Sequence, residues 1–211
     1  MTEKVKKIYT RRAKYYDITE KTYALFGFRE EKYRRISIEK LDLKDGDLVV
    51  DLGCGTGKNF LQIQEKIGPT GKIIGVDFTH AMLQEAQRKI AKFGWDNVSL
   101  VEADMSEYVF PADVDAVLST FALSFSEKYD SVIKQVHLHL RENGRFIIAD
   151  TQWNEALPKW FIKLFVLSAS LFGVSEKTLK HNLLSSIQNS FQSSNVDKYY
   201  FGTVSIIQAT K

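Results

Sequence analysis

The stretch that decides the fold runs from residue 48 to residue 57 and reads Leu48-Val49-Val50-Asp51-Leu52-Gly53-Cys54-Gly55-Thr56-Gly57. A second apolar run follows at 73–76 and ends in Asp77. This order predicts a buried strand, a glycine loop, a helix and a second strand that ends in a carboxylate. Such a layout is typical of a nucleoside-binding crevice at the carboxyl edge of a parallel sheet, where the acid accepts hydrogen bonds from two ribose hydroxyls.

The spacing of the glycines distinguishes two kinds of nucleoside site. A dinucleotide fingerprint, G-x-G-x-x-G, would begin at Gly53 and would require a glycine at position 58, where this chain has Lys58. The third glycine comes one residue early, at Gly57, and Asp51 stands two residues before the first. A nicotinamide-dependent oxidoreductase remains an alternative, although the chain has no Tyr-x-x-x-Lys pair after the expected fourth strand.

The pattern from Asp51 to Gly57 resembles motif I of the class I S-adenosylmethionine-dependent methyltransferases. Two further family features follow in order, namely Asp77 at a strand end and the run 101–105, Val-Glu-Ala-Asp-Met. The resemblance runs over most of the chain. It implies that the loop wraps the methionyl part of S-adenosylmethionine, that Asp77 binds the ribose, and that an acid after the third strand meets the adenine amino group.

The resemblance carries over to individual residues. The residues that we expect to bind the cofactor are Tyr16, Asp51, Gly53, Cys54, Gly55, Gly57, Asp77, Phe78, Met82, Asp104, Met105 and Ser119. Few members of the family have an obligatory catalytic residue, so none is assigned here. No metal is expected, because no cluster of histidine, cysteine and carboxylate stands out. Cys54 is interpreted as a small packing residue rather than a nucleophile.

Composition and charge restrict the class of protein. A chain of 211 residues with 44% hydrophobic residues suits one domain with a sizeable core. One cysteine and an amino end without an apolar signal-like run favour the cytoplasm. Residues 1–40 hold twelve Lys or Arg and six Asp or Glu, a local charge of +6, so the remainder carries −3 of the total of +3. This basic arm either faces an anionic partner or is a solvated helix face.

Alternating apolar runs and amphipathic stretches predict βαβ units. The expected fold is therefore α/β, with a doubly wound, mostly parallel, seven-stranded Rossmann-like sheet that ends in an antiparallel hairpin around Gly202. The expected strands are 47–52, 72–77, 97–102, 114–119 and 145–150, with helices 58–67, 79–93 (Thr79 as N-cap) and 127–142, the last of them stopped by Asn143-Gly144. We expect one methyltransferase domain, 1–211, made of a helical lid (1–43, divided near Gly27) and a cofactor-binding core (44–211) with a helical insertion (156–192, helices 156–172 and 175–192).

The amino-terminal run Arg11-Arg12-Ala13-Lys14-Tyr15-Tyr16-Asp17 is similar to the Ala-x-x-Tyr-Asp segment of quinone C-methyltransferases and bacterial phosphatidylethanolamine N-methyltransferases. In those families this helix lies over the cofactor as a lid, and Tyr16 is the matching tyrosine. Core packing of Tyr16 is the alternative. Phe26-Gly27-Phe28 favours the lipid-amine branch, and the absence of an Asn shortly after Asp17 weakens the quinone branch.

Residues 156–172 form an almost wholly apolar stretch that is too short for a membrane span of about 20 residues. The sheet covers at most part of the surface of such a helix. The rest of its apolar surface is covered by the core itself, the lid, a long apolar substrate, a second subunit, or a membrane surface with Trp160 and the lysines at head-group level; these alternatives stay open.

These observations predict methyl transfer to a small or lipid-like acceptor, with lipid-amine N-methylation preferred. Quinone C-methylation, small-metabolite methylation and a non-catalytic methyltransferase-like subunit are the alternatives. The segment 119–125 lacks the Asn- or Asp-Pro-Pro-aromatic motif of enzymes that methylate nucleic-acid bases, so no nucleic-acid partner is expected. Peripheral association with the inner membrane face is an open possibility, and the oligomeric state is undetermined.

Overall fold

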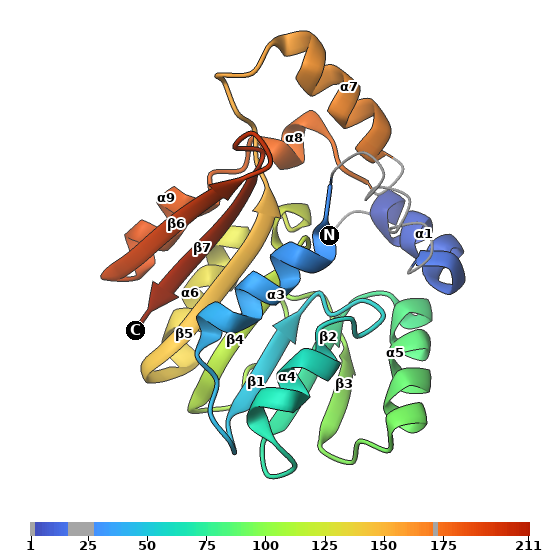
Figure 1. Cartoon of the computed structure of the whole chain (residues 1–211), viewed down its shortest axis with the longest axis vertical. Helices are drawn as coiled ribbons and strands as arrows, with labels where there is room; N and C mark the ends of the chain where they lie inside the picture. Colours follow the sequence, from blue (N-terminus) through green and yellow to red (C-terminus); the bar gives the residue numbers. More distant parts are fainter. Residues whose placement is uncertain (1–2, 17–27, 171–172) are drawn as a thin grey trace.

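A seven-stranded sheet forms the centre of the computed structural model, which describes residues 3–16, 28–170 and 173–211 (Figure 1). The strand order is β3-β2-β1-β4-β5-β7-β6. The first five strands run parallel, β7 pairs antiparallel with β5, and β6 pairs antiparallel with β7. The strands are β1 (Leu48–Leu52), β2 (Lys72–Asp77), β3 (Val98–Glu102), β4 (Val114–Thr120), β5 (Leu140–Thr151), β6 (Ser193–Tyr199) and β7 (Val204–Thr210). The predicted doubly wound sheet with a terminal antiparallel hairpin is confirmed.

Helices cover both faces of the sheet (Figure 1). Successive strand residues point to opposite faces, so that Val49 packs in one core cluster and Val50 in the other. One face carries α3 (Glu30–Leu41), α4 (Phe60–Ile67) and α5 (His80–Phe93), and the other carries α6 (Tyr129–His139) and α9 (Leu183–Ser190). The remaining helical segments described are α1 (Glu3–Arg12), η1 (Ala13–Tyr15), η2 (Leu123–Phe125), α7 (Lys159–Ala169) and α8 (Glu176–Leu179).

Two helix boundaries differ from the sequence-based prediction. The helix expected at 127–142 ends at His139, because β5 already begins at Leu140, which pairs with Val114. Asn143, with a φ of 63°, lies in an irregular part of β5, where the register with β4 shifts, and does not terminate the helix. The helix expected at 175–192 is two helices, since Asn182 accepts a hydrogen bond from the Ser185 amide at 3.1 Å and starts α9 afresh.

The amino-terminal helices occupy two different places. α1 and η1 pack against α5, and Tyr16 directly after them is buried against Met82. α3 instead lies in the layer on the sheet, where Tyr33, Ile38 and Leu41 are buried. Of the described parts of the predicted lid, residues 3–16 therefore lie beside α5 and α3 lies on the sheet, and the expected break at Gly27 falls outside the described residues.

The first part of the insertion after β5 lies beyond the carboxyl edge of the sheet, where α7 stands above α8 (Figure 1). On α7, Ile162 is buried, whereas Trp160, Leu164 and Leu167 are 67%, 59% and 70% exposed. These three residues are spaced i, i+4, i+7 and share one face of the helix. In the part of the chain that the structure describes, no helix combines the length and the apolar character that a membrane crossing requires.

Candidate functional site

A cavity lies where β1, β2 and β4 end, at the point where the strand order reverses on either side of β1. Open α/β sheets bind ligands at this topological switch point. About 490 Å³ of space lies between its walls, a volume that includes solvent at the open mouth. Its described lining is Tyr9, Tyr16, Arg34, Gly53, Cys54, Gly55, Thr56, Lys58, Asp77, Phe78, Thr79, Met82, Thr120, Phe121, Ala122 and Phe125.

The glycine loop forms the floor of this cavity. Gly53 has a φ of +72°, and a Cβ built on it would lie 2.3 Å from the Cβ of Ala122. Gly55 has a φ of +54°, but a Cβ there would meet no atom within 4 Å. The backbone at Gly55 therefore borders open space into which a ligand fits, whereas Gly53 is required by close packing of the loop after β4. Gly57 serves helix packing, because a Cβ there would lie 2.6 Å from the ring of Phe60.

Asp77 ends β2 and points into the same space. Its Oδ1 accepts a hydrogen bond from the Thr79 amide at 2.8 Å, and its Oδ2 accepts one from the Gly55 amide at 3.0 Å. Burial raises the pKa of Asp77 above its ordinary value, the two amides oppose this, and Glu102 adds to it. The carboxylate is thus fixed in place while it keeps unused acceptor capacity.

Thr79 shows that this part of the cavity is polar. It occupies the N-cap position of α5, as predicted, but its side chain makes no capping hydrogen bond. Its hydroxyl is buried and lies beside the Asp77 carboxylate, where a hydrogen bond from Thr79 helps to lower the pKa of Asp77.

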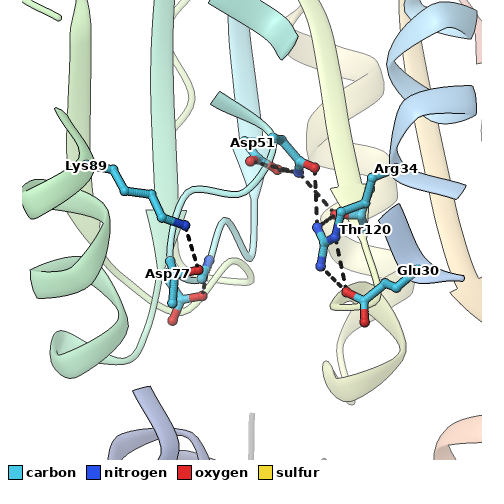
Figure 2. Close-up of polar contacts among 9 residues, drawn as sticks. Glu30, Arg34, Asp51, Asp77, Lys89 and Thr120 are labelled. Carbon is cyan, nitrogen blue, oxygen red and sulfur yellow. Dashed lines mark hydrogen bonds and ion pairs between the residues drawn. The ribbon is translucent and has the colours of Figure 1, made fainter. Parts of the chain in front are cut away.

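A buried network of polar side chains holds the opposite wall, where β1 and β4 meet α3 (Figure 2). The guanidinium of Arg34 donates to Asn59 Oδ1 at 3.3 Å and to the hydroxyl of Thr120, and it forms an ion pair with Glu30. The Asn59 amide in turn donates to both oxygens of Asp51, at 3.1 and 3.0 Å. These contacts connect α3, β1, α4 and β4 across the sheet edge.

Asp51 lies at the centre of this network and is fully buried. Burial raises its pKa to about 7, although Asn59 and Arg34 lower it, and Asp77 adds to the increase. Because its carboxylate is turned toward Asn59, Asp51 is not part of the described lining of the cavity. Its contacts are those of a residue that holds the glycine loop in place from behind.

Aromatic rings cover the cavity from the amino-terminal side. The ring of Tyr9 on α1 lies 5.8 Å from that of Tyr16 and 6.2 Å from that of Phe125. The ammonium of Lys58 lies 5.6 Å from the Tyr16 ring. Burial is the main cause that raises the pKa of Tyr9 far above its ordinary value, so this hydroxyl stays protonated. The rings form an apolar roof that excludes water.

The structure brings seven of the twelve predicted residues into the cavity lining, and these are Tyr16, Gly53, Cys54, Gly55, Asp77, Phe78 and Met82. The other five lie around it, outside the lining as described: Asp51, Gly57, Asp104, Met105 and Ser119. Asp104 accepts hydrogen bonds from the amide and hydroxyl of Ser106, both at 2.9 Å, while Ser119 donates to the Leu52 carbonyl at 3.1 Å. Met105 packs in the core.

Nine lining residues are not among the cofactor-binding residues predicted from the sequence. They are Tyr9, Arg34, Thr56, Lys58, Thr79, Thr120, Phe121, Ala122 and Phe125. Tyr9 lies seven residues before Tyr16, a helical spacing that places both on one face, so this signal was available. Arg34 belongs to the basic arm, and nothing in the sequence separates it from the exposed cations around it.

Two further expectations concern chemistry at the site. Burial raises the pKa of the Cys54 thiol well above its ordinary value, so the thiolate required of a nucleophile is disfavoured. Among the residues that the structure describes, no group of three or more histidine, cysteine or carboxylate side chains is placed to hold a metal ion.

Comparison with known proteins identifies the family of this site. Residues 43–198 match a family model described as a methyltransferase domain. The chain belongs to this family. The match covers most of the chain and, together with the fold, identifies an enzyme of the class I S-adenosylmethionine-dependent methyltransferases, as the glycine motif predicted.

Relatives and solved structures agree with the assignment. A demethylmenaquinone methyltransferase of Listeria monocytogenes serotype 4a is 26% identical over 183 residues, which cover 83% of this chain and 76% of the relative. A geranyl diphosphate methyltransferase in complex with S-adenosylmethionine shares the fold with a TM-score of 0.66 at 15% identity, covering 84% of this chain and 82% of that one. A Haemonchus contortus phosphoethanolamine N-methyltransferase 2, in complex with phosphomonomethylethanolamine and S-adenosylhomocysteine, has a TM-score of 0.61 at 21% identity. The match covers 74% of this chain but only 35% of that one.

Proposed function

We propose that this methyltransferase transfers the methyl group of S-adenosylmethionine to an apolar hydroquinone-type acceptor. The observation that carries the proposal is the meeting of the open Gly55 backbone, the buried Asp77 carboxylate and the aromatic roof in one cavity. The curated relatives of the Listeria type, named demethylmenaquinone methyltransferases, support a quinone-derived acceptor.

The residues around the cavity fit the cofactor part by part. Asp77 is placed to accept hydrogen bonds from the ribose hydroxyls, because two amides orient its carboxylate toward the cavity. The methionyl carboxylate is assigned to the side that carries Arg34 and Lys58, the two cations of the described lining. The adenine is assigned to the edge near Asp104, which follows β3. When bound, S-adenosylmethionine supplies an electrophilic methyl group.

The chain's own contribution to catalysis is to position the two reactants and to exclude water from them. Tyr9, Tyr16 and Phe125 close the cavity from above, so the two reactants meet away from solvent. Holding reacting atoms about 3 Å apart in a dry site accounts for a large part of the rate increase in such displacements.

The lipid-amine acceptor that the sequence favoured is the competing proposal. It has no support among the curated relatives described above, and the phosphoethanolamine enzyme shares only the fold at 21% identity. Phosphatidylethanolamine therefore serves as the second acceptor in the test.

Association with a membrane surface belongs to the same proposal. Trp160, Leu164 and Leu167 form an exposed apolar face on α7, and Lys159 and Lys163 are exposed beside them. This combination suits an anionic bilayer, where apolar burial gives about 25 cal/mol per Å² and each nearby lysine adds roughly 1 kcal/mol. Co-sedimentation with anionic vesicles at low salt is expected and should fall with added salt. Protein that stays in the supernatant would contradict it.

The experiment for the reaction uses S-adenosylmethionine labelled in its methyl group. The protein is incubated with vesicles that contain either a reduced prenylated naphthoquinone or phosphatidylethanolamine, and the label in each lipid is measured. We expect label in the naphthohydroquinone. Label in phosphatidylethanolamine alone would establish the lipid amine instead, and cofactor binding without transfer to either would favour a non-catalytic subunit.

A further inference from the structure

A second cavity adjoins the cofactor cavity on the side of the insertion. It lies among α1, η2, Ser170 and residues 173–181, and its space of about 710 Å³ includes solvent at the open mouth. Phe125 lines both cavities, so its ring is the boundary between them. The walls are mainly apolar and include Val5, Ile8 and Val174. An apolar molecule that fills this space reaches the cofactor cavity past one side chain.

His181 is one of the polar groups in this wall and the one imidazole among the described lining residues. Its Nδ1 is buried, and the ring makes a hydrogen bond to the backbone carbonyl of Ser124. The ring as a whole is half-buried and forms part of the cavity wall. The ring of Tyr129 lies 4.7 Å away at an interplanar angle of 32° and limits the rotation of the imidazole. A histidine held in this way in a cavity wall is suited to proton transfer through its second nitrogen.

The surroundings of His181 keep the ring neutral and prepare it to accept a proton. Burial lowers its pKa below the ordinary value; the Ser124 carbonyl opposes this, Lys177 adds to it, and Glu127 and Asp130 oppose it. A neutral imidazole is the form that can act as a base near neutral pH. The carbonyl and the two carboxylates then stabilise the imidazolium that forms.

The loop that carries Ser124 is itself fixed. The buried carboxylate of Asp150 accepts hydrogen bonds from the Ser124 amide at 2.9 Å and from the Ser124 hydroxyl at 2.8 Å. This anchors η2, which holds both the Phe125 boundary and the carbonyl that faces His181. The imidazole and the boundary between the cavities are therefore held by one rigid turn.

We propose that the second cavity binds an apolar aromatic acceptor that bears a hydroxyl group, and that His181 takes the proton of this hydroxyl during methyl transfer. The inference rests on the proposed function. It assigns the acceptor side of the site to α1, η2 and the insertion, and it gives the chain a catalytic residue.

The step balances as follows for a hydroquinone. The acceptor's O–H bond breaks and its proton goes to Nε2 of His181. The ring carbon ortho to that oxygen, which carries a hydrogen, then supplies the electron pair for the new carbon–carbon bond to the methyl group, while the carbon–sulfur bond breaks and leaves its pair on sulfur. The hydrogen on the methylated carbon shifts as a proton to the oxygen and restores the aromatic ring, and His181 releases its proton to solvent.

The test compares His181→Gln with the wild-type enzyme and uses His139→Gln, on the far end of α6, as a matched control. The acceptors are a short-chain prenyl-1,4-naphthohydroquinone and a ring-fluorinated analogue whose hydroxyl is more acidic. We expect kcat of His181→Gln to fall about 100-fold to 10,000-fold with the first acceptor, while Kd for S-adenosylmethionine changes less than twofold. The loss of kcat in His181→Gln should be smaller with the fluorinated acceptor, whose hydroxyl gives up its proton more easily. The kcat of His139→Gln should match that of the wild type with both acceptors.

Two exposed charges give a test that does not depend on the folding of His181→Gln. Lys177→Met should move the acidic limb of the kcat–pH profile to higher pH, and Glu127→Gln should move it to lower pH, because the two charges act on His181 in opposite directions. An equal kcat and an unchanged profile in all variants would overturn the role of His181. Absence of transfer by the wild type to either hydroquinone, with cofactor bound, would instead overturn the proposed function.

Discussion

The cofactor cavity and the second cavity are built in different ways. The first is formed at the ends of β1, β2 and β4, and its loop conformation is fixed by glycines with positive φ and by backbone amides on Asp77. The second is assembled from α1, η2 and the insertion, which come from both ends and the middle of the chain. In the proposed arrangement, the sheet edge binds the cofactor that the whole family shares, while connecting segments shape the space for the acceptor.

Gly53→Ala and Gly55→Ala form a matched pair on the rigid side. Both place a Cβ at a positive φ, which costs about 1–2 kcal/mol. Only the Gly53 variant also drives that Cβ into Ala122, so we expect its free energy of unfolding to fall by about 2–5 kcal/mol in total. Urea denaturation measures both losses. Equal losses would show that the loop after β4 can move away from the glycine loop.

Asp51 gives a pH dependence that belongs to the same region. In the folded protein the Asp51 carboxyl keeps its proton up to about pH 7, whereas in the unfolded chain it releases the proton near pH 3.8. The resulting contribution to the free energy of unfolding is fully present below pH 3.8 and is lost as the pH rises to about 7. At about 1.4 kcal/mol per pH unit, the loss over this interval is roughly 4 to 4.5 kcal/mol.

Asp51→Asn should remove this part of the pH dependence. The wild type loses stability as the pH rises and the variant does not. We therefore expect the free energy of unfolding of the variant minus that of the wild type to increase by up to about 4 kcal/mol between pH 4 and pH 8. Denaturation at intermediate pH values locates the change. Parallel curves for the two proteins would show that the carboxyl has no raised pKa in the folded state.

Asp77→Ala tests ligand binding rather than folding. Loss of two charge-assisted hydrogen bonds to the ribose should weaken S-adenosylmethionine binding by about 2–4 kcal/mol, or roughly 30-fold to 800-fold. Asp77→Asn is the control that keeps the shape of the side chain. Calorimetric titration measures Kd. A loss of affinity below tenfold, with the fold intact, would show that Asp77 does not bind the ribose.

The exposed face of α7 should respond least. Leu167 is 70% exposed on α7, so Leu167→Ala should change the free energy of unfolding by less than about 0.5 kcal/mol. Leu179 on α8 is 2% exposed, and the same substitution there should cost about 2–5 kcal/mol. Thermal unfolding of both variants checks the contrast. A large loss at Leu167 would mean that the exposed face of α7 is a packing surface.

Much of the cofactor side was predictable because its signals are local. Apolar runs that end in glycines or carboxylates determine strands and their functional ends, and seven of twelve predicted residues line the cavity. The five that do not, such as Asp51, share the motif but support the loop from outside the described lining. The helix ends near His139 and Asn182 were placed wrongly, because strand pairing and a new N-cap decide them.

The sequence by itself determined the family, most of the strands and the position of the nucleotide-binding edge, since each follows from short patterns that act through neighbouring residues. Only the tertiary structure decided that Arg34 is buried against Thr120, which lies 86 residues further along the chain, and that His181 lies in the wall of a cavity beside Phe125. These placements depend on which segments pack together. Packing energies between distant side chains leave no periodic trace in a sequence, so a buried functional cation and a solvated one look the same until the chain is folded.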